Sequence, residues 1–464
     1  MPRILPRSTP EAEGVSSAAL LAFFRALDEL DSIHSLMVMR HGRVIAEAWK
    51  KPYAPELPHM LFSLSKSFTS CAVGFACAEG KLSLDARLID LFPDKLPERL
   101  DEKFERMRIR HLLAMDSGHD HCTMDDMAPV PDWEKAFFAA APAFEPGTHF
   151  CYNSGATYML ASAVVRAAGQ GLRDYLRPRL FEPLGIARRD WELSPAGIEV
   201  GGWGFNLTTE EIASFAQCLL DHGMRDGRQV IPPDYLDRAV SVQSDNSSND
   251  QPDWKLGYGF QFWRCRHNAF RGDGAFGQYA IAMPEQDMAV AITSGLHNMQ
   301  SVLDRVWELL LPAAGKSAAS DPAAAEAFRK EAAAWSLPVL GSAGKRLPLR
   351  RYALAGNEPG FRTLTLASFD DRVELALDGE TLSAGFGRRL DNRLSWREPI
   401  PRRMAASARW NSEHELELLV SCCETPFQWS IRIHADEGSV KLVREENVSF
   451  RTRPWPELTG VRAD

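Results

Sequence analysis

The sequence predicts a mixed α/β chain in which strands flank a long helical middle and a separate antiparallel β domain follows. Near the start, two β-favouring runs flank His41-Gly42, which is typical of a hairpin. The pattern from 101 to 240 is mostly helical, and strand signals return over 256–265 and in "QYAIAMP" and "MAVAITSG". The composition then changes sharply over 312–335. A chain of 464 residues is too long for one ordinary core, so this change marks a domain boundary.

This change of composition separates two domains of unequal size. Residues 1–312 form the N-terminal domain, and residues 313–335 are an Ala-rich linker that runs into a short helix. Residues 336–464, called here the C-terminal β domain, contain β-like runs such as "RVELALDG" and "FQWSIRIHA" separated by turn residues. Its role stays open between a lid, a dimerisation surface and a carbohydrate-binding module. Four of its aromatic residues are expected in its core: Trp396, Trp410, Phe427 and Trp429.

Composition and charge exclude several classes of partner. Hydrophobic residues make up 45% and charged residues 25%, as in ordinary globular proteins. The formal net charge of −9, without a long basic run, argues against nucleic acid. No apolar run reaches 18 residues and no signal-peptide core is present, so we expect no membrane partner and a cytoplasmic location. The 8 scattered cysteines favour reduced thiols over disulfides, and the oligomeric state is not indicated.

The stretch "LFSLSKSFTS" (61–70) places polar residues where an apolar helix begins. Ser63 is expected at or near the N-terminus of this helix, and Lys66 lies one turn later on the same face. A hydroxyl, the positive end of a helix dipole and an ammonium therefore coincide. The alternative is a Ser N-cap followed by a solvated Lys, because S-x-x-K is expected about once by chance in such a chain. The helix ends at Gly80 and buries one face: Leu64, Phe68, Cys71, Ala72, Phe75 and Ala76.

A tyrosine on a later loop is a second candidate for chemistry. Pro146-Gly147 makes a turn, and Tyr152-Asn153-Ser154 then precedes another helical run. A phenol close to an ammonium could accept a proton. The alternative is an anchored aromatic residue with no role in chemistry.

Glycines cluster in "RGDGAFGQYAIAMPEQDMAVAITS" before a strand. Gly272, Gly274 and Gly277 match G-x-G-x-x-G, but a dinucleotide fingerprint needs a helix to follow, and "QYAIAM" favours a strand. We therefore expect no nucleotide and no other cofactor. Glycines at this point let the backbone approach a ligand closely.

One loop offers a possible metal site. His119, Asp120, His121 and Cys122 lie within "SGHDHCTMDD", and such side chains bind zinc. A single loop rarely supplies four usable ligands at this density, so we expect a polar loop at the rim of a cleft and no metal. No G-x-S-x-G elbow occurs, which argues against an α/β-hydrolase.

Taken together in order, these segments resemble the serine β-lactamase and penicillin-binding protein superfamily. The likeness is to its class C-like serine hydrolases, which include β-lactamases, D,D-peptidases, esterases and the 6-aminohexanoate-dimer hydrolases. It covers about residues 10–312 and rests on several ordered segments, since S-x-x-K alone is weak. These segments are "SLSK" (63–66), "IRHLLAMDSG" (109–118), "PGTHF" before "YNS" (152–154), "GGWGFNLTTEEIASF" (201–215) and "RGDGAFGQYAIAMPEQDMAVAIT".

Two positions depart from the family pattern. Residue 154 is Ser where the class C pattern has Asn, so a substrate-amide contact is lost. The third box is not K-T-G, because no Lys precedes Gly274 and Arg271-Gly272-Asp273 stands there instead. A site for the β-lactam carboxylate is therefore not evident. Weak β-lactam hydrolysis and activity on an ester or amide are expected.

The resemblance implies a β-lactamase-like antiparallel sheet flanked by helices, with an all-helical subdomain. It implies attack by Ser63 on a small-molecule ester or amide, with Lys66 and Tyr152 sharing the proton and Lys66 keeping the pKa of the phenol low. The product of attack is an acyl-enzyme that water releases. The alternative is a catalytically idle penicillin-binding or sensor protein on the same scaffold. The backbone N–H of Ser63 and the strand near 274–278 would form the oxyanion hole, with substrate and oxyanion contacts from Ser154, Asp273, Gly274, Gly277 and Gln278.

Overall fold

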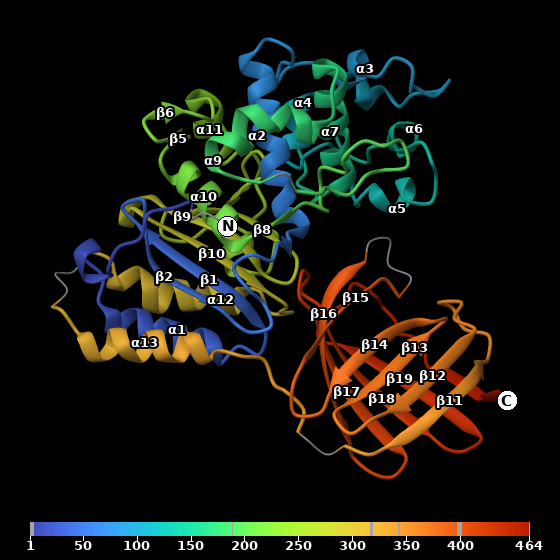
Figure 1. The fold of residues 1–464 in the computed structure, drawn as a ribbon. Helices are drawn as coiled ribbons and strands as arrows, with labels where there is room; N and C mark the ends of the chain where they lie inside the picture. The colour runs from blue at the N-terminus through green and yellow to red at the C-terminus, as the bar shows by residue number, and fades with distance from the viewer. Residues whose placement is uncertain (1–3, 188, 316–318, 342–343, 397–400, 464) are drawn as a thin grey trace.

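The computed structural model describes residues 4–187, 189–315, 319–341, 344–396 and 401–463. Residues 316–318 of the expected linker lie outside the described residues. Two domains follow one another along the chain, joined through the helix α13 (Pro322–Ala334) (Figure 1). Within the described ranges, no helix combines the length and the apolar character that a membrane crossing requires.

A six-stranded antiparallel sheet forms the centre of the N-terminal domain, in the order β2-β1-β10-β9-β8-β7. The expected hairpin is confirmed, and its first strand also pairs with the last strand of the sheet, Val38 lying opposite Val290. The sheet is therefore built from both ends of the domain. Its strands are β1 (Ile33–Arg40), β2 (Arg43–Trp49), β7 (Trp263–Arg264), β8 (Phe270–Gly274), β9 (Gln278–Met283) and β10 (Met288–Ser294).

The expectation of a long strand over 256–265 is wrong. Only the two residues of β7 are strand there. Gly257 and Gln261 adopt left-handed backbone conformations, with φ of 103° and 66°, which interrupt an extended chain. The segment folds instead as a loop that carries Trp263 beside Tyr152.

Helices cover both faces of this sheet (Figure 1). Helix α1 (Ser17–Asp28) packs with α13 on one face, and α10 (Thr209–Leu220) packs against β1, β9 and β10 on the other. A capping box in which Thr208 and Glu211 bond to each other's backbone starts α10, as the sequence predicts. The other helices are α2 (Ser65–Ala78), α3 (Leu88–Leu91), α4 (Ile109–Leu113), α5 (Met124–Met127), α6 (Trp133–Ala139), α7 (Ser154–Ala168), α8 (Leu172–Leu176), α9 (Glu182–Leu184), α11 (Pro233–Ala239) and α12 (Gln300–Arg305).

The C-terminal β domain is a ten-stranded antiparallel sheet that closes on itself where β14 pairs with β16. Trp396, Trp410 and Trp429 are buried in its core, as expected. Its strands are β11 (Leu347–Leu354), β12 (Thr363–Ser368), β13 (Arg372–Leu377), β14 (Glu380–Gly385), β15 (Leu390–Leu394), β16 (Arg402–Trp410), β17 (Glu415–Cys422), β18 (Gln428–Ala435), β19 (Ser439–Glu446) and β20 (Leu458–Ala463).

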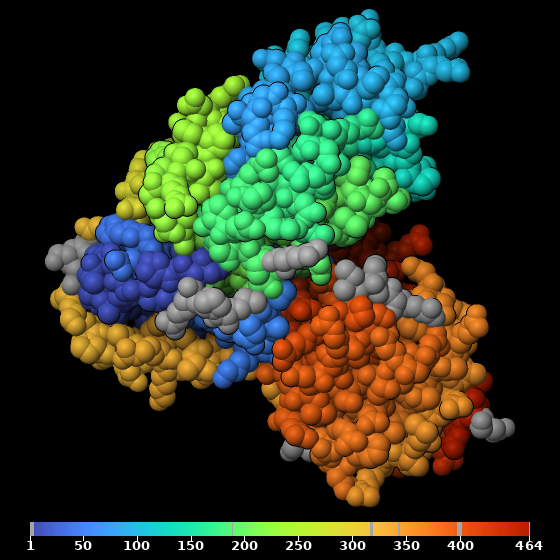
Figure 2. All heavy atoms as spheres, turned by 45° about the horizontal axis from the view of Figure 1, so that its top comes forward, coloured from blue at the N-terminus to red at the C-terminus, as the bar shows by residue number. Residues whose placement is uncertain are grey.

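The C-terminal β domain is docked against the N-terminal domain, and Figure 2 shows the two as adjoining lobes. The short strand β3 (His59–Met60) forms one contact, because the Met60 N–H donates to the Glu424 carbonyl at 2.9 Å. The Tyr53 hydroxyl donates to the Thr425 carbonyl at 3.1 Å. Asn447 Nδ2 donates to the Gly295 carbonyl at 3.0 Å. These bonds place the domain beside the chain that leads to Ser63.

A buried pair of histidines lies at this interface. His34 Nδ1 is 3.0 Å from His59 Nε2, and His59 Nδ1 is 3.1 Å from the Met60 carbonyl. His34 Nε2 is 3.0 Å from Ser32 Oγ and 3.2 Å from Gln428 Nε2 of the C-terminal β domain. Two neutral rings satisfy this chain, since each donates through Nδ1 and accepts through Nε2. Burial lowers the pKa of His59 to about 4 and holds that of His34 well below its usual value.

The pair should make stability depend on pH. The pKa of His59 is lower in the folded chain than in the unfolded one, so stability is full above about 6.5 and falls as the pH drops toward 4. At roughly 1.4 kcal/mol per pH unit, the free energy of unfolding should fall by about 2 kcal/mol more in the wild type than in His59→Gln between pH 6.5 and 5. Denaturant titrations at both pH values measure this, with exposed His414→Gln as the control. Equal losses of unfolding free energy in His59→Gln and in the wild type would contradict the assignment of a neutral, buried His59.

Candidate active site

Ser63 lies in a single 3₁₀ turn, Phe62–Leu64, that runs directly into α2 at Ser65. It stands one turn before the helix, and no side-chain capping bond occurs there, so the N-cap alternative is wrong. Phe62 has a φ of 47°, a left-handed conformation that costs a bulky residue of order 1–3 kcal/mol. Burial holds this turn in place, because Leu64 and every residue of α2 from Ser65 to Ala76 are buried. The expectation that α2 buries only one face is therefore wrong.

Two glycines of β8 make room for the Ser63 turn. A Cβ at Gly274 would lie 1.9 Å from the Leu61 carbonyl oxygen, and one at Gly272 would lie 2.5 Å from Ser67 Oγ. Only glycine allows the strand to pass so close to the start of α2. The close approach of the backbone that was expected at these glycines is therefore an approach to the Ser63 turn, which fills the space that a side chain would need.

Lys66 lies in the first turn of α2, and its side chain is 1% exposed. Its Nζ lies 3.1 Å from Ser63 Oγ, 3.0 Å from Ser154 Oγ and 2.7 Å from the Gly202 carbonyl oxygen. No carboxylate of the described chain forms an ion pair with Nζ. Burial lowers the pKa of Lys66 to about 7, although the charges of Cys122 and Asp273 oppose this shift. The alternative of a solvated lysine is therefore wrong.

Gly202 is a site residue that the sequence analysis missed. Its carbonyl accepts the shortest of the three bonds from Lys66. A Cβ at this position would lie 3.5 Å from Nζ and 3.3 Å from the Ser154 carbonyl oxygen. Backbone acceptors carry no residue-type signal, and the glycines of "GGWG" were the only available hint.

Tyr152 faces Ser63 from the loop before α7. Its hydroxyl interacts with that of Ser63, and Nζ of Lys66 lies 4.9 Å from the ring centroid. The ring stacks on Trp263 with centroids 5.4 Å apart. Burial and the nearby Asp273 charge raise the pKa of the phenol, and the Ser63 bond offsets only part of this. The expectation that Lys66 keeps this pKa low is therefore wrong, because the amine loses its own charge by burial.

The first turn of α7 supplies the next site residue. Asn153 is the N-cap, its Oδ1 accepting from the N–H of Gly155 at 2.9 Å and of Ala156 at 3.2 Å. The following residue, Ser154, thereby projects its hydroxyl to Lys66. Ser154 occupies the position of the family Asn, and here it contacts the amine of Lys66.

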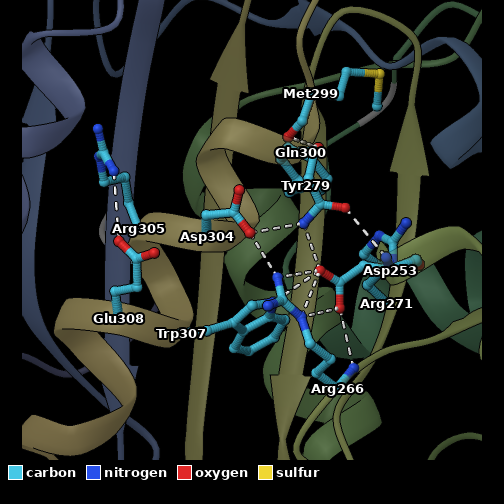
Figure 3. Close-up of polar contacts among 10 residues, drawn as sticks. All are labelled: Asp253, Arg266, Arg271, Tyr279, Met299, Gln300, Asp304, Arg305, Trp307 and Glu308. Carbon is cyan, nitrogen blue, oxygen red and sulfur yellow. Dashed lines mark hydrogen bonds and ion pairs between the residues drawn. The ribbon is translucent and has the colours of Figure 1, made fainter. Parts of the chain in front are cut away.

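Asp273 lies on β8 at the wall of the site, with its side chain 5% exposed. Its Oδ2 accepts from Arg271 Nε at 2.8 Å, and Trp263 also bonds to it. Burial raises the pKa of Asp273, and the Arg271 charge opposes only part of this. Arg271 is in turn held by the Asp253 carbonyl oxygen at 2.8 Å (Figure 3).

A network of polar contacts supports this wall from behind (Figure 3). The buried Asp253 carboxylate accepts from Arg266, Gln300 and Trp307, at 2.8 Å from Arg266 Nη2 and 3.1 Å from Trp307 Nε1. These bonds join the loop before β7 to α12. Arg271 therefore has a rigid partner on the side away from the site.

The turn between β8 and β9 holds the remaining expected residues. Ala275 lines the cavity beside Ser63. Gln278 is buried behind it, with Nε2 donating to the Ala275 carbonyl at 3.0 Å and to the Ser294 carbonyl at 2.8 Å. Gly277 has a φ of 93°, and a Cβ there would lie 2.1 Å from Ser294 Oγ. Gly274, Gly277 and Gln278 therefore shape the turn, while Ser154 and Asp273 face the cavity.

The cavity in front of Ser63 has a volume of about 910 Å³. Three carboxylates line it, those of Asp125, Glu192 and Asp273. No lysine, arginine or histidine is among the described residues of the lining. Much of the lining is aromatic and comes from both domains, including Phe62, Tyr152, Trp203, Trp263, Phe427 and Phe450. Phe427, expected in the core of the C-terminal β domain, packs against that core but is only partly buried, and it also lines the cavity.

The loop considered as a metal site has other contacts. His119 is buried between Ser117 Oγ and the Ala140 carbonyl, each 2.9 Å from a ring nitrogen. His121 lies 2.7 Å from both Asp120 and Asp126 carboxylates. Within the described ranges, no group of three or more His, Cys, Asp or Glu side chains is arranged to hold a metal ion. Cys122 instead lines the cavity beside Ser154.

Curated proteins resemble parts of this chain in sequence. The 6-aminohexanoate-dimer hydrolase of Paenarthrobacter ureafaciens is 23% identical over 281 residues, which are 55% of this chain and 71% of that protein. The D-aminopeptidase of Brucella canis is 30% identical over 169 residues, only 34% of this chain and 31% of that protein.

Solved structures extend the likeness of the fold to both domains. A putative 6-aminohexanoate-dimer hydrolase from Bacillus anthracis covers 62% of this chain and 81% of its own, at a TM-score of 0.54 and 20% identity. The octameric penicillin-binding protein homologue from Pyrococcus abyssi covers 95% of this chain and 99% of its own, at a TM-score of 0.52 and 16% identity.

The family model that matches the sequence is described as Beta-lactamase, and it matches residues 25–313. That range includes Ser63, Lys66, Tyr152, the Gly202 loop and β8, which together build the site. The chain therefore belongs to the beta-lactamase family.

Proposed function

We propose that the protein is a serine hydrolase that cleaves a small ester or amide through an acyl-enzyme on Ser63. The observation that carries the proposal is the buried Lys66 amine 3.1 Å from Ser63 Oγ. An amine with a pKa of about 7 is partly neutral at physiological pH and so accepts a proton. The relatives that hydrolyse amides support the same class of reaction.

Acylation begins with the neutral amine of Lys66. Its two N–H groups donate to the Gly202 carbonyl and to Ser154 Oγ, so its lone pair faces the Ser63 hydroxyl. Ser63 Oγ attacks the substrate carbonyl while its proton moves to Nζ. Tyr152, whose raised pKa keeps the phenol protonated, donates a hydrogen bond near Oγ, passes its proton to the leaving group and regains one from Lys66, which thereby returns to the neutral amine.

The negative oxygen of the tetrahedral intermediate needs donors that are already in place. We assign these to the backbone N–H groups of Ser63 and Ala275, which both border the cavity. Loss of one such donor typically costs about 3 kcal/mol of transition-state stabilisation. Water then attacks the acyl group while neutral Lys66 takes its proton. That proton returns to Ser63 Oγ as the bond between Oγ and the acyl carbon breaks, and the acid product leaves.

Replacement of the nucleophile tests the proposal directly. Ser63→Ala should abolish turnover of p-nitrophenyl acetate and labelling by a fluorophosphonate, while the melting temperature stays within a few degrees of wild type. The control is Ser67→Ala, since Ser67 donates to the Gln261 carbonyl on the far side of the helix start. Turnover by Ser63→Ala would refute the nucleophile. Labelling of the wild type without turnover on any ester or amide would favour the idle sensor.

The pH profile tests the base. Deprotonation of Lys66 creates the active form, so kcat/KM should rise about tenfold per pH unit below about 7 and level off above it. Tyr152→Phe should lower kcat by about a hundredfold and leave this midpoint in place, because the phenol is not the titrating group. In Lys66→Ala, the rise of kcat/KM with a midpoint at about pH 7 should disappear. A wild-type midpoint above pH 9 would instead identify a phenolate base, and a loss below about threefold in Tyr152→Phe would make Tyr152 a packing residue.

The charge of the cavity tests the substrate class. Nitrocefin carries a carboxylate, and the lining offers three carboxylates and no basic side chain among its described residues. Its kcat/KM should therefore be at least about a hundredfold below that of p-nitrophenyl acetate. Asp273→Asn removes one repelling charge and should reduce the difference in kcat/KM between the two substrates. Equal kcat/KM values for the two substrates in the wild type would refute this reading of the cavity.

A further inference from the structure

We propose that the C-terminal β domain supplies part of the substrate pocket, through an aromatic wall that selects an apolar, preferably aromatic, group beside the scissile carbonyl. The aromatic wall consists of Phe62 and Phe276 from the N-terminal domain and Phe427 and Phe450 from the C-terminal β domain. This inference rests on the proposed hydrolase function and specifies its substrate class.

The four rings form one cluster across the domain interface. The Phe62 ring lies 5.5 Å from that of Phe276 and 5.5 Å from that of Phe450, measured between centroids. Phe276 lies 4.7 Å from Phe450 and 5.9 Å from Phe427. Phe62 and Phe427 are 6.2 Å apart. These separations and the edge-to-face angles are those of favourable aromatic pairs.

The aromatic wall stands next to the reacting atoms. Phe62 directly precedes Ser63, and Phe276 directly follows Ala275, the two residues assigned to the oxyanion hole. Both phenylalanines have left-handed backbones, with φ of 47° and 66°. A substrate carbonyl held at Ser63 therefore has this cluster as a neighbour.

Phe450 is not explained by a role in the core of its own domain, and Phe427 lines the cavity as well as packing against that core. Phe450 is 66% exposed and Phe427 is half-buried. Both residues line the cavity. The tryptophans of the same domain are buried, with Trp429 only 4% exposed. An exposed phenyl group at the mouth of a cavity is available for contact with a ligand.

Both loops that carry these rings are fixed to the N-terminal domain. On the Phe427 loop, the carbonyls of Glu424 and Thr425 accept bonds from Met60 N and the Tyr53 hydroxyl. On the Phe450 loop, Asn447 Nδ2 donates to the Gly295 carbonyl at 3.0 Å and to the Pro426 carbonyl at 3.0 Å, which also joins the two loops. The aromatic wall is therefore held in position before any substrate arrives.

The chemistry of the aromatic wall defines its ligand. Phe62, Phe427 and Phe450 line the cavity, and the buried Phe276 supports them. These rings offer dispersion and stacking but no hydrogen bond, so a small acetyl group gains little from them, whereas a benzyl or phenyl group buries its surface there. The group can belong to the acyl or to the alcohol part of the substrate. The two possibilities are separated by varying each part alone.

The test compares two pairs of esters on the full-length chain. For the acyl part, the ratio of kcat/KM is measured for p-nitrophenyl phenylacetate over p-nitrophenyl acetate, and for the alcohol part, phenyl acetate over ethyl acetate. Phe450→Ala should lower one of these ratios about tenfold, and Phe427→Ala should lower the same one. Phe450→Tyr, which keeps the ring, should restore that ratio to within about twofold of wild type. The matched control is Phe369→Ala, an exposed phenylalanine of the same domain outside the cavity lining.

Unchanged ratios in both pairs for Phe450→Ala and Phe427→Ala would overturn the proposal, provided that turnover still depends on Ser63. Turnover that survives Ser63→Ala would instead refute the proposed function itself, so the two failures are distinguishable. Melting temperatures of the variants identify any loss of folding. Should Phe427→Ala fail to fold, Phe427→Leu replaces it, because leucine fills the space without a ring.

Discussion

The amine of Lys66 is buried, and no carboxylate of the described residues forms an ion pair with it. The rest of the site depends on this constraint. Lys66 is 1% exposed, and its three bonds go to Ser63, Ser154 and Gly202. These partners come from the 3₁₀ turn, the start of α7 and a loop before α10, so three separate segments must meet at one atom. A charged ammonium in this position is costly, and the amine lowers that cost by losing its proton. The destabilising burial is therefore what creates a base near neutral pH.

The same meeting point explains the strained backbone around it. Phe62 and Phe276 adopt left-handed conformations that phenylalanine disfavours, and they flank the two assigned oxyanion donors. Glycine at 272 and 274 removes the side chains that would push β8 away from the turn. The mutual packing of the phenyl rings offsets part of the strain. The close approach of β8 and the fixed conformation of the Phe62–Leu64 turn therefore depend on each other.

The sequence predicted those features that residue type and spacing encode. The spacing of Ser63 and Lys66, the helical run after Tyr152 and the hairpin at His41-Gly42 follow local rules, and the structure contains all of them. The bond from Lys66 to the Gly202 carbonyl could not be predicted from the sequence, because every residue has a backbone carbonyl. The protonation of Tyr152 was predicted in the wrong direction, since burial is a property of the tertiary fold. Phe427 was expected in a core because its segment has the strand pattern, which says nothing about the facing domain.

The position of the domain interface links catalysis to the second domain. Strand β3 contains His59 and Met60, ends three residues before Ser63, and is bonded to the C-terminal β domain through Met60 N. The buried His34–His59 pair connects that strand to β1 and, through Gln428, to β18. Because β3 is bonded both to β1 and to the C-terminal β domain, the segment that leads to Ser63 has little freedom to move. Removal of the C-terminal β domain would therefore release the segment leading to Ser63 as well as half of the aromatic wall, because both domains shape the cavity in front of Ser63.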